Sequence, residues 1–282
     1  ALDEMGKAEL SEEKSLDVEY EMPFLHHATM EPMNCTAHVT SNSCEIWVPT
    51  QNQEDCMNAA KDITGLSEDQ IIVHTTLLGG GFGRRGEKDF VIQAVIVSKA
   101  IQKPVQVIWS REEDTQHGFY RPASMSRFQI DLGKDGLPIK WDSQIAQPNM
   151  ASRWIPPLGW INFDPLAVAA TVHDYGLLPD HFYKVDGVNS EHTGVELGVP
   201  IGPWRAPPNS LNVFYTESVV DELAYIAGQD PLDYRISLIK DSPRHLSVLK
   251  QVAKQASWGK SLPEGHGRGI AINEWFPLDE DK

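Results

Sequence analysis

The chain has 282 residues, a formal net charge of −16 and a hydrophobic content of 41%, enough to form a buried core. The acidic balance argues against nucleic acid and anionic membrane surfaces as partners, because both would repel the chain. No apolar run approaches the roughly eighteen residues of a transmembrane helix, and three cysteines without a C-x-x-C pair argue against an iron–sulfur cluster or a zinc site held by this chain.

The first half of the chain alternates between strand-like and helix-like segments. Residues 1–16 are charged and are expected to form an edge or a frayed terminus. The pattern then predicts strands within residues 35–49, a helix over 53–64 that ends at Gly65, a strand over 71–78, a helix over 87–103 and a strand over 104–109. The sequence SREED (110–114) is expected to begin a short turn.

The second half opens with a hairpin signal, because residues 125–132 and 137–146 flank a Gly-Lys-Asp-Gly turn. Residues 147–200 show little periodicity and are expected to wrap the surface or face a partner. Helices are predicted over 210–228, from Pro231 onward and over 245–255. These elements predict an α+β fold with mixed sheets and packed helices rather than a doubly wound fold.

By this pattern the chain divides into four segments. They are an entry segment (1–34), a strand and helix unit with a glycine-rich turn (35–146), an irregular wrap (147–200) and a mainly helical segment (201–282).

Residues 79–86 read GGGFGRRG and lie between a predicted strand and a predicted helix. Three consecutive glycines let the backbone pass close to a bulky polar group. Backbone N–H groups at a helix N-terminus favour negative charge. The turn therefore predicts a binding site for a phosphate or another anionic group of a cofactor.

The same turn contains a G-x-G-x-x-G pattern at Gly81, Gly83 and Gly86, which is typical of an NAD(P)-binding Rossmann-like domain. Two features argue against this interpretation. About seventy residues of strand-like and helical sequence precede the turn, and the turn carries Arg84 and Arg85 where small or apolar residues are usual. A non-catalytic interaction module is the other alternative.

Four segments, taken together, resemble the large molybdopterin-binding subunit of the molybdenum hydroxylases, the superfamily of xanthine dehydrogenase and aldehyde oxidoreductase. They are YEMPFLHHATMEPMNCTA (20–37), WVPTQNQ (47–53), GGGFGRR (79–85) and GPWRAPPNSLNVFYTESVVDELAYIAGQDPLDYR (202–235). The GGGFGRR form is most similar to the branch of the isoquinoline 1-oxidoreductase beta subunit. The resemblance implies a fold of the molybdenum cofactor-binding type.

The resemblance also implies a set of cofactor-binding residues. Gln51 would hydrogen-bond an oxo ligand of the molybdenum, and Arg205 would bring its backbone N–H to the metal side. The full set is Gln51, Gly79, Gly80, Gly81, Phe82, Gly83, Arg84, Trp204, Arg205 and Ala206. No side chain is expected to ligate the metal, because the family holds molybdenum through the dithiolene sulfurs of the pterin.

Two pairs of adjacent residues could have either a binding role or a structural role. Arg84 and Arg85 would clamp the pyrophosphate of a dinucleotide form, molybdopterin cytosine dinucleotide, or else pair with Glu87 or Asp89. His26 and His27 lie near Glu31 but are expected to be structural, because adjacent side chains of an extended segment point to opposite faces.

The chain departs from the family pattern in one respect, because it offers no candidate for the catalytic glutamate found near the end of the family subunit. Residues 1–282 are therefore expected to be the first half of a longer subunit, inactive alone. The whole enzyme would hydroxylate N-heterocyclic aromatics or oxidise aldehydes with water-derived oxygen. Its partners would be the missing second half and an iron–sulfur small subunit, and the family suggests the periplasm.

Overall fold

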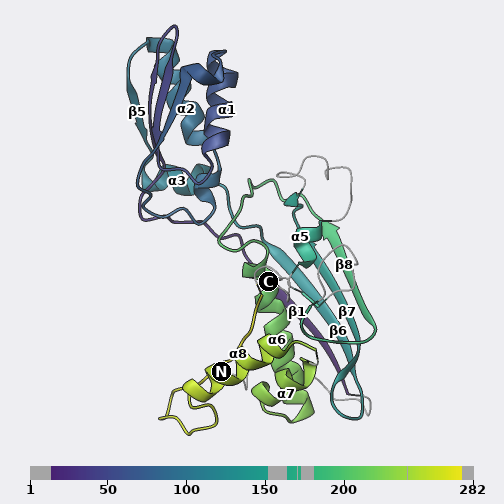
Figure 1. Ribbon diagram of the computed structural model, residues 1–282. Coiled ribbons are helices and arrows are strands. Elements are labelled where there is room, and N and C mark those ends of the chain that lie inside the picture. Colours follow the sequence, from purple (N-terminus) through teal and green to yellow (C-terminus); the bar gives the residue numbers. More distant parts are fainter. Residues whose placement is uncertain (1–13, 152–163, 170, 173–180, 240, 275–282) are drawn as a thin grey trace. The chain divides into compact units, whose positions relative to one another are not determined.

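The computed structural model describes residues 14–151, 164–169, 171–172, 181–239 and 241–274 (Figure 1). The chain forms two compact units. One, here called the turn unit, comprises Phe24–Pro122 and Leu197–Arg205. The other, here called the hairpin unit, takes the remaining residues up to Pro23, from Ala123–Glu196 and from Ala206 onward. The four segments expected from the sequence are therefore not the compact units.

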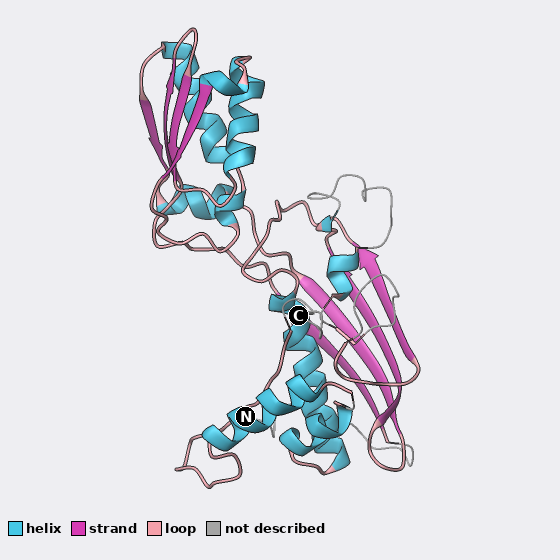
Figure 2. Ribbon diagram, in the orientation of Figure 1, coloured by secondary structure: helices cyan, strands magenta, loops and turns pink. Residues whose placement is uncertain are grey.

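The turn unit is a four-stranded sheet in the order β4-β3-β2-β5. Its strands are β2 (Asn34–Val39), β3 (Cys44–Val48), β4 (Ile71–Thr75) and β5 (Val105–Ile108). Its helices are α1 (Gln53–Thr64), α2 (Asp89–Ile101) and α3 (Arg111–His117), with 3₁₀ turns at Glu68–Gln70 and Arg84–Gly86. Helix α2 packs on β2 and β5 while α1 packs beside it on β4, so both cover one face of the sheet (Figure 2).

Helix α1 connects β3 to β4, and these two strands run parallel. The side chain of Asn52 caps the helix by accepting a hydrogen bond from the backbone N–H of Asp55. Gly65 ends it in the left-handed conformation with φ of 76°. The bounds match the predicted 53–64, and the stop at Gly65 is a signal local in the sequence. The cap at Asn52 also fixes the chain immediately after Gln51.

The hairpin unit contains a second four-stranded sheet in the order β1-β6-β7-β8. Its strands are β1 (Ser15–Met22), β6 (Ser124–Leu132), β7 (Pro138–Gln147) and β8 (Val188–Gly194). Its helices are α5 (Pro165–Val168), α6 (Asn209–Ala227), α7 (Pro231–Leu238) and α8 (Pro243–Gln255). Trp141 and Phe128 of the sheet and Tyr215 of α6 are fully buried in its core. A buried Arg235 pairs with Glu217 across 2.9 Å.

The predicted α+β fold is confirmed, as are the hairpin, the helix after Asn52 and the three helices beyond residue 208. The strand before the glycines is shorter than expected, because it ends at Thr75. SREED begins helix α3 rather than a turn, with Ser110 as its N-cap.

Two further predictions meet the structure only in part. The expected irregular wrap contains strand β8, which pairs in parallel with β7; residues 152–163 and 173–180 of that wrap lie outside the described residues. Of the N-terminal prediction, residues 1–13 also lie outside them, and Ser15 already belongs to β1. All three cysteines, Cys35, Cys44 and Cys56, are buried and free. None of the helices in the described part of the chain is long and apolar enough to cross a membrane.

Candidate functional site

Two adjacent parallel strands bring Gln51 and the glycine turn together. Strands β3 and β4 pair in parallel with Val48 opposite Thr75, so both chains leave the sheet at the same edge. Gln51 follows β3, and the glycine turn follows β4. The backbone N–H of Gly83 donates a hydrogen bond to Oε1 of Gln51 at 2.9 Å.

This hydrogen bond fixes the orientation of the Gln51 amide. A backbone N–H only donates, so the group that faces Gly83 is the carbonyl oxygen, and the amide nitrogen points away from it. Gln51 is exposed, and its Nε2 has no hydrogen-bond partner within the described residues. The backbone N–H of Gln51 donates to the carbonyl of Arg85 at 2.9 Å. The result is a positioned neutral donor that does not titrate.

The carbonyl groups from Gly79 to Phe82 all have partners in the chain. Those of Gly79, Gly80, Gly81 and Phe82 accept hydrogen bonds from Glu31 N–H, Arg85 Nε, Arg84 N–H and Arg205 N–H respectively. The N–H groups of Gly80, Gly81 and Phe82, in contrast, meet no acceptor in the part of the chain that the structure describes. With Gln51 Nε2 they form a set of available donors, which suits an acceptor-rich ligand.

The glycines are required by neighbouring residues of the same chain. A Cβ at Gly81 would lie 2.4 Å from Oε1 of Gln51, and a Cβ at Gly83 would lie 1.9 Å from the carbonyl oxygen of Pro203. At Gly79 it would lie 2.4 Å from Cβ of Glu31. The close approach expected of this turn is therefore to Gln51, Glu31 and Pro203, and it does not by itself leave room for a cofactor.

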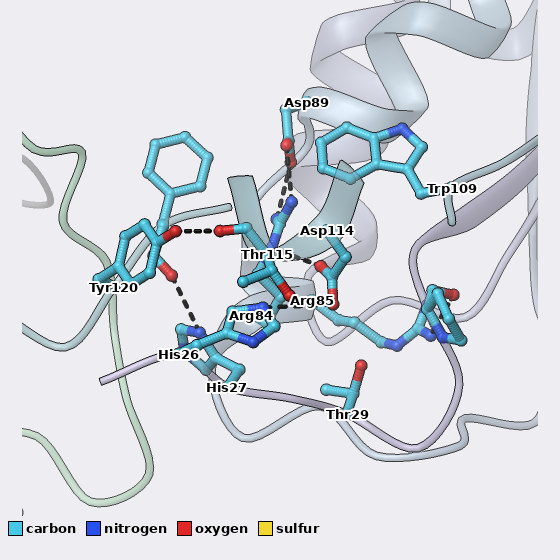
Figure 3. Close-up of polar contacts among 12 residues, drawn as sticks. His26, His27, Thr29, Arg84, Arg85, Asp89, Trp109, Asp114, Thr115 and Tyr120 are labelled. Atoms are coloured by element: carbon cyan, nitrogen blue, oxygen red, sulfur yellow. Dashed lines mark hydrogen bonds and ion pairs between the residues drawn. The ribbon is translucent and has the colours of Figure 1, made fainter. Parts of the chain in front are cut away.

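Arg84 lies inside the protein, with no exposed surface. Its guanidinium donates to both carboxylate oxygens of Asp89, at 2.9 and 2.7 Å, and Nε lies 3.7 Å from Asp114 (Figure 3). The rings of Phe90, Trp109 and Phe119 surround it with centroids 5.3–5.9 Å away. Of the two alternatives left by the sequence, the structure therefore has the ion pair between Arg84 and Asp89, and the buried Arg84 guanidinium does not form the pyrophosphate clamp.

The glycines also do not lie at the N-terminus of helix α2. Helix α2 begins at Asp89, whereas Gly83 is the N-cap and Gly86 the last residue of the preceding 3₁₀ turn. The acidic residue in the first turn of α2 already complements the helix dipole. The anion-binding argument from the helix dipole therefore fails, and the available backbone donors of the turn take its place.

The segment around Trp204 closes the turn from another side. The N–H of Arg205 donates to the carbonyl of Phe82 at 2.8 Å. It was expected to face the metal, but this hydrogen bond uses it within the chain. The Arg205 guanidinium lies 5.7 Å from the centroid of the Phe82 ring. Trp204 Nε1 donates to His26 O at 3.4 Å. Ala206 follows with φ of 59° and already belongs to the hairpin unit.

The two adjacent histidines have separate partners, as expected. Nε2 of His26 lies 3.3 Å from Asp114. His27 lies between two carbonyl oxygens, with Nδ1 3.1 Å from that of Phe119 and Nε2 2.6 Å from that of Pro203. Burial lowers the pKa of His27. Within the described ranges, no three His, Cys, Asp or Glu side chains are grouped to hold a metal ion.

Sequence reasoning missed two residues that shape the turn. Pro203 contacts Gly83, and Glu31 accepts a hydrogen bond from Gly79 N–H through Oε2 at 2.7 Å. Each lies more than forty positions from its partner in the chain. Nothing local in the sequence indicates these contacts.

Comparisons with known proteins place these observations in a family context. The family model described as a molybdopterin cofactor-binding domain matches residues 4–237. The chain is 28% identical to the beta chain of isoquinoline 1-oxidoreductase from Brevundimonas diminuta, over 90% of this chain and 32% of that protein. It is 27% identical to a nicotinate dehydrogenase subunit from Pseudomonas putida, over 92% and 23%. The chain therefore spans about a quarter to a third of these relatives.

Solved structures show the same fold. The aldehyde oxidoreductase from Desulfovibrio gigas matches with a TM-score of 0.70 and 16% identity, over 86% of this chain and 27% of that one. Quinoline 2-oxidoreductase from Pseudomonas putida 86 matches with a TM-score of 0.70 and 17% identity, over 86% and 32%. At these identities the similarity concerns the fold alone.

Proposed function

The chain belongs to the molybdopterin cofactor-binding domain family, and we propose that its glycine turn and Gln51 form one side of the cofactor site of a molybdenum-dependent oxidoreductase. The single observation that carries this assignment is the set of available donors. The N–H groups of Gly80, Gly81 and Phe82 and the Nε2 of Gln51 have no acceptor in the described residues, while every carbonyl from Gly79 to Phe82 is used.

These residues fit the cofactor chemically. Molybdopterin and its metal carry acceptor oxygens and ring heteroatoms, which suit a row of backbone N–H donors. When bound, the cofactor supplies the two-electron redox chemistry. Gln51 would donate a hydrogen bond to one of its oxygens without exchanging a proton, because a side-chain amide does not titrate. Phe82, whose side chain is 42% exposed, would present an apolar surface beside these donors.

The whole protein would then hydroxylate N-heterocyclic aromatics or oxidise aldehydes. Two relatives are named for isoquinoline and nicotinate, which are both nitrogen-containing aromatic rings, and another for an aldehyde. An iron–sulfur subunit and a second cofactor-binding half would complete the enzyme, since this chain covers only part of its relatives. A periplasmic location belongs to the same proposal.

A cytosine dinucleotide form of molybdopterin is part of the proposal, with one change from the sequence expectation. Both Arg84 and Arg85 are fully buried, and their guanidinium groups have partners inside the chain. The phosphates of a dinucleotide would therefore bind elsewhere than on these two arginines.

The nicotinamide alternative has no support in the geometry. Residues 76–88 separate β4 from α2, so the glycines do not open the helix as a dinucleotide turn does. The first turn of α2 holds Asp89, which pairs with Arg84. An anionic pyrophosphate at that helix end would meet a carboxylate.

The proposal is tested on the intact protein, produced in a host that makes molybdenum cofactor and in a matched host that does not. We expect molybdenum and oxidised pterin near one per chain in the first host and none in the second. We also expect dye-linked oxidation of N-heterocycles or aldehydes in the first host only. Folded protein without molybdenum from the competent host would contradict the proposal.

A further inference from the structure

The Arg85 side chain joins the glycine turn to two other segments of the turn unit. Its side chain has no exposed surface. Nε donates to the carbonyl of Gly80 at 3.0 Å, and Nη1 donates to that of Pro49 at 3.1 Å. Nη2 donates to the carbonyls of Glu31 at 2.7 Å and Pro32 at 3.2 Å. One guanidinium thus contacts the glycine turn, the chain before Gln51 and the chain after Met30.

The main chain of Arg85 contacts the same region from its other side. Its carbonyl oxygen accepts hydrogen bonds from the backbone N–H of Gln51 at 2.9 Å and from the hydroxyl of Thr50 at 3.1 Å. Arg85 therefore forms hydrogen bonds with three consecutive residues, Pro49, Thr50 and Gln51. The hydrogen bond between Gln51 and Gly83 depends on where this segment lies relative to the turn.

Glu31 neutralises the buried charge and connects it to the turn. Its Oε2 lies 3.1 Å from Nη2 of Arg85 and accepts from Gly79 N–H at 2.7 Å. Asn34 Nδ2 donates to the other oxygen at 2.8 Å. A lysine would not replace Arg85, because an ammonium is a compact charge with three donors and lacks the planar fork that reaches these separated carbonyls.

We propose that Arg85 is the positioning residue of the turn. It holds Pro49 and Gly80 at the separation at which Gln51 Oε1 accepts from Gly83 and Gln51 Nε2 stays available. The geometry concerns this chain alone, whereas its consequence for turnover rests on the proposed function.

The geometric part is tested without cofactor, by amide hydrogen exchange in the 282-residue chain labelled with ¹⁵N-glycine. We expect Arg85→Lys to speed exchange of the Gly79 and Gly83 amides about tenfold or more. Arg235→Lys is the matched control, because Arg235 is equally buried and pairs with Glu217 and Asp221 in the hairpin unit. The control should lower thermal stability while leaving both amides unchanged. Unchanged Gly83 exchange in Arg85→Lys would overturn the proposal.

A milder variant covers the case in which Arg85→Lys does not fold. Glu31→Gln removes the charge that Arg85 faces but keeps an acceptor, and its side chain is 35% exposed. We expect this variant to fold and to speed exchange at both Gly79 and Gly83, although less than Arg85→Lys does. Wild-type exchange at both amides would overturn the proposal.

The catalytic consequence is tested in the intact enzyme by a double-mutant cycle. If Arg85 acts through Gln51, Arg85→Lys should lower kcat with little change in KM, and adding it to Gln51→Ala should cause no further loss. The losses from Arg235→Lys and Gln51→Ala should multiply instead. If the kcat losses of Arg85→Lys and Gln51→Ala multiplied in the double variant, Arg85 would have a merely structural role. Wild-type enzyme without molybdenum would count against the proposed function and leave the exchange result intact.

Discussion

The side-chain oxygen of Gln51 lies 2.9 Å from the backbone nitrogen of Gly83 and accepts its hydrogen bond. The two residues are 32 positions apart and meet because parallel strands β3 and β4 end at the same edge of the sheet. This bond leaves the amide nitrogen of Gln51 as a donor with a defined direction. The predictions below follow from this relationship and from the packing of the turn.

The first prediction separates the two ends of the Gln51 amide. In the intact enzyme, Gln51→Glu keeps an acceptor for Gly83 but removes the donor, whereas Gln51→Ala removes both. We expect both to fold, Gln51→Ala to keep its molybdenum, and both to lower turnover. A lost hydrogen bond that strengthens during reaction is worth on the order of 1–3 kcal/mol, about five- to 150-fold in kcat. Wild-type kcat in both variants would exclude a role for the donor.

The second prediction concerns Gly81. Because a Cβ there would lie 2.4 Å from Oε1 of Gln51, Gly81→Ala should displace Gln51 and reproduce the kinetic defect of Gln51→Ala. Gly86→Ala is the matched control, since its Cβ would come no closer than 4.0 Å to Pro203. Molybdenum content and kcat measured on the same samples decide the matter. A fall in molybdenum alone would mean that position 81 contacts the cofactor directly.

The third prediction concerns the stability of the turn. Gly83 has φ of 98°, and a Cβ there would lie 1.9 Å from the carbonyl oxygen of Pro203. Gly198 also has a positive φ, of 69°, but open space around its Cβ. Gly198→Ala should cost only backbone strain, about 1–2 kcal/mol, whereas Gly83→Ala should cost more than about 3 kcal/mol because backbone must move as well. Urea unfolding of both variants measures the difference, and equal losses would contradict the packing at Pro203.

The fourth prediction concerns pH and His27. Burial, with Arg84 and His26 nearby, lowers its pKa in the folded state below the ordinary value. The unfolded chain therefore binds a proton first as the pH falls, so this contribution is present above pH about 6.5 and is lost in more acidic solution. The stability difference between wild type and His27→Gln should shrink from pH 8 to pH 5. A difference that grows instead would mean that protonated His27 donates to both Phe119 and Pro203.

Several features of this protein follow from the sequence alone. The end of helix α1 was predicted because Gly65 is a local capping signal, and the hairpin of β6 and β7 because its turn residues and strand alternation are local as well. The family was recognised because several motifs occur in register, which a single glycine run would not establish. The roles of Gln51 and Phe82 in binding remain predictions.

Only the tertiary structure decided what each residue of the turn contacts. The glycines at 81 and 83 are required by Gln51 and Pro203, and Arg84 and Arg85 have internal partners rather than a phosphate. It also decided that, among the described residues, the carbonyls of Gly79 to Phe82 have partners whereas the N–H groups of Gly80, Gly81 and Phe82 have none. Such contacts join segments far apart in the chain, and no periodicity or capping rule encodes them. They exist because parallel strands end at one edge and because a buried charge must find its partners inside the fold.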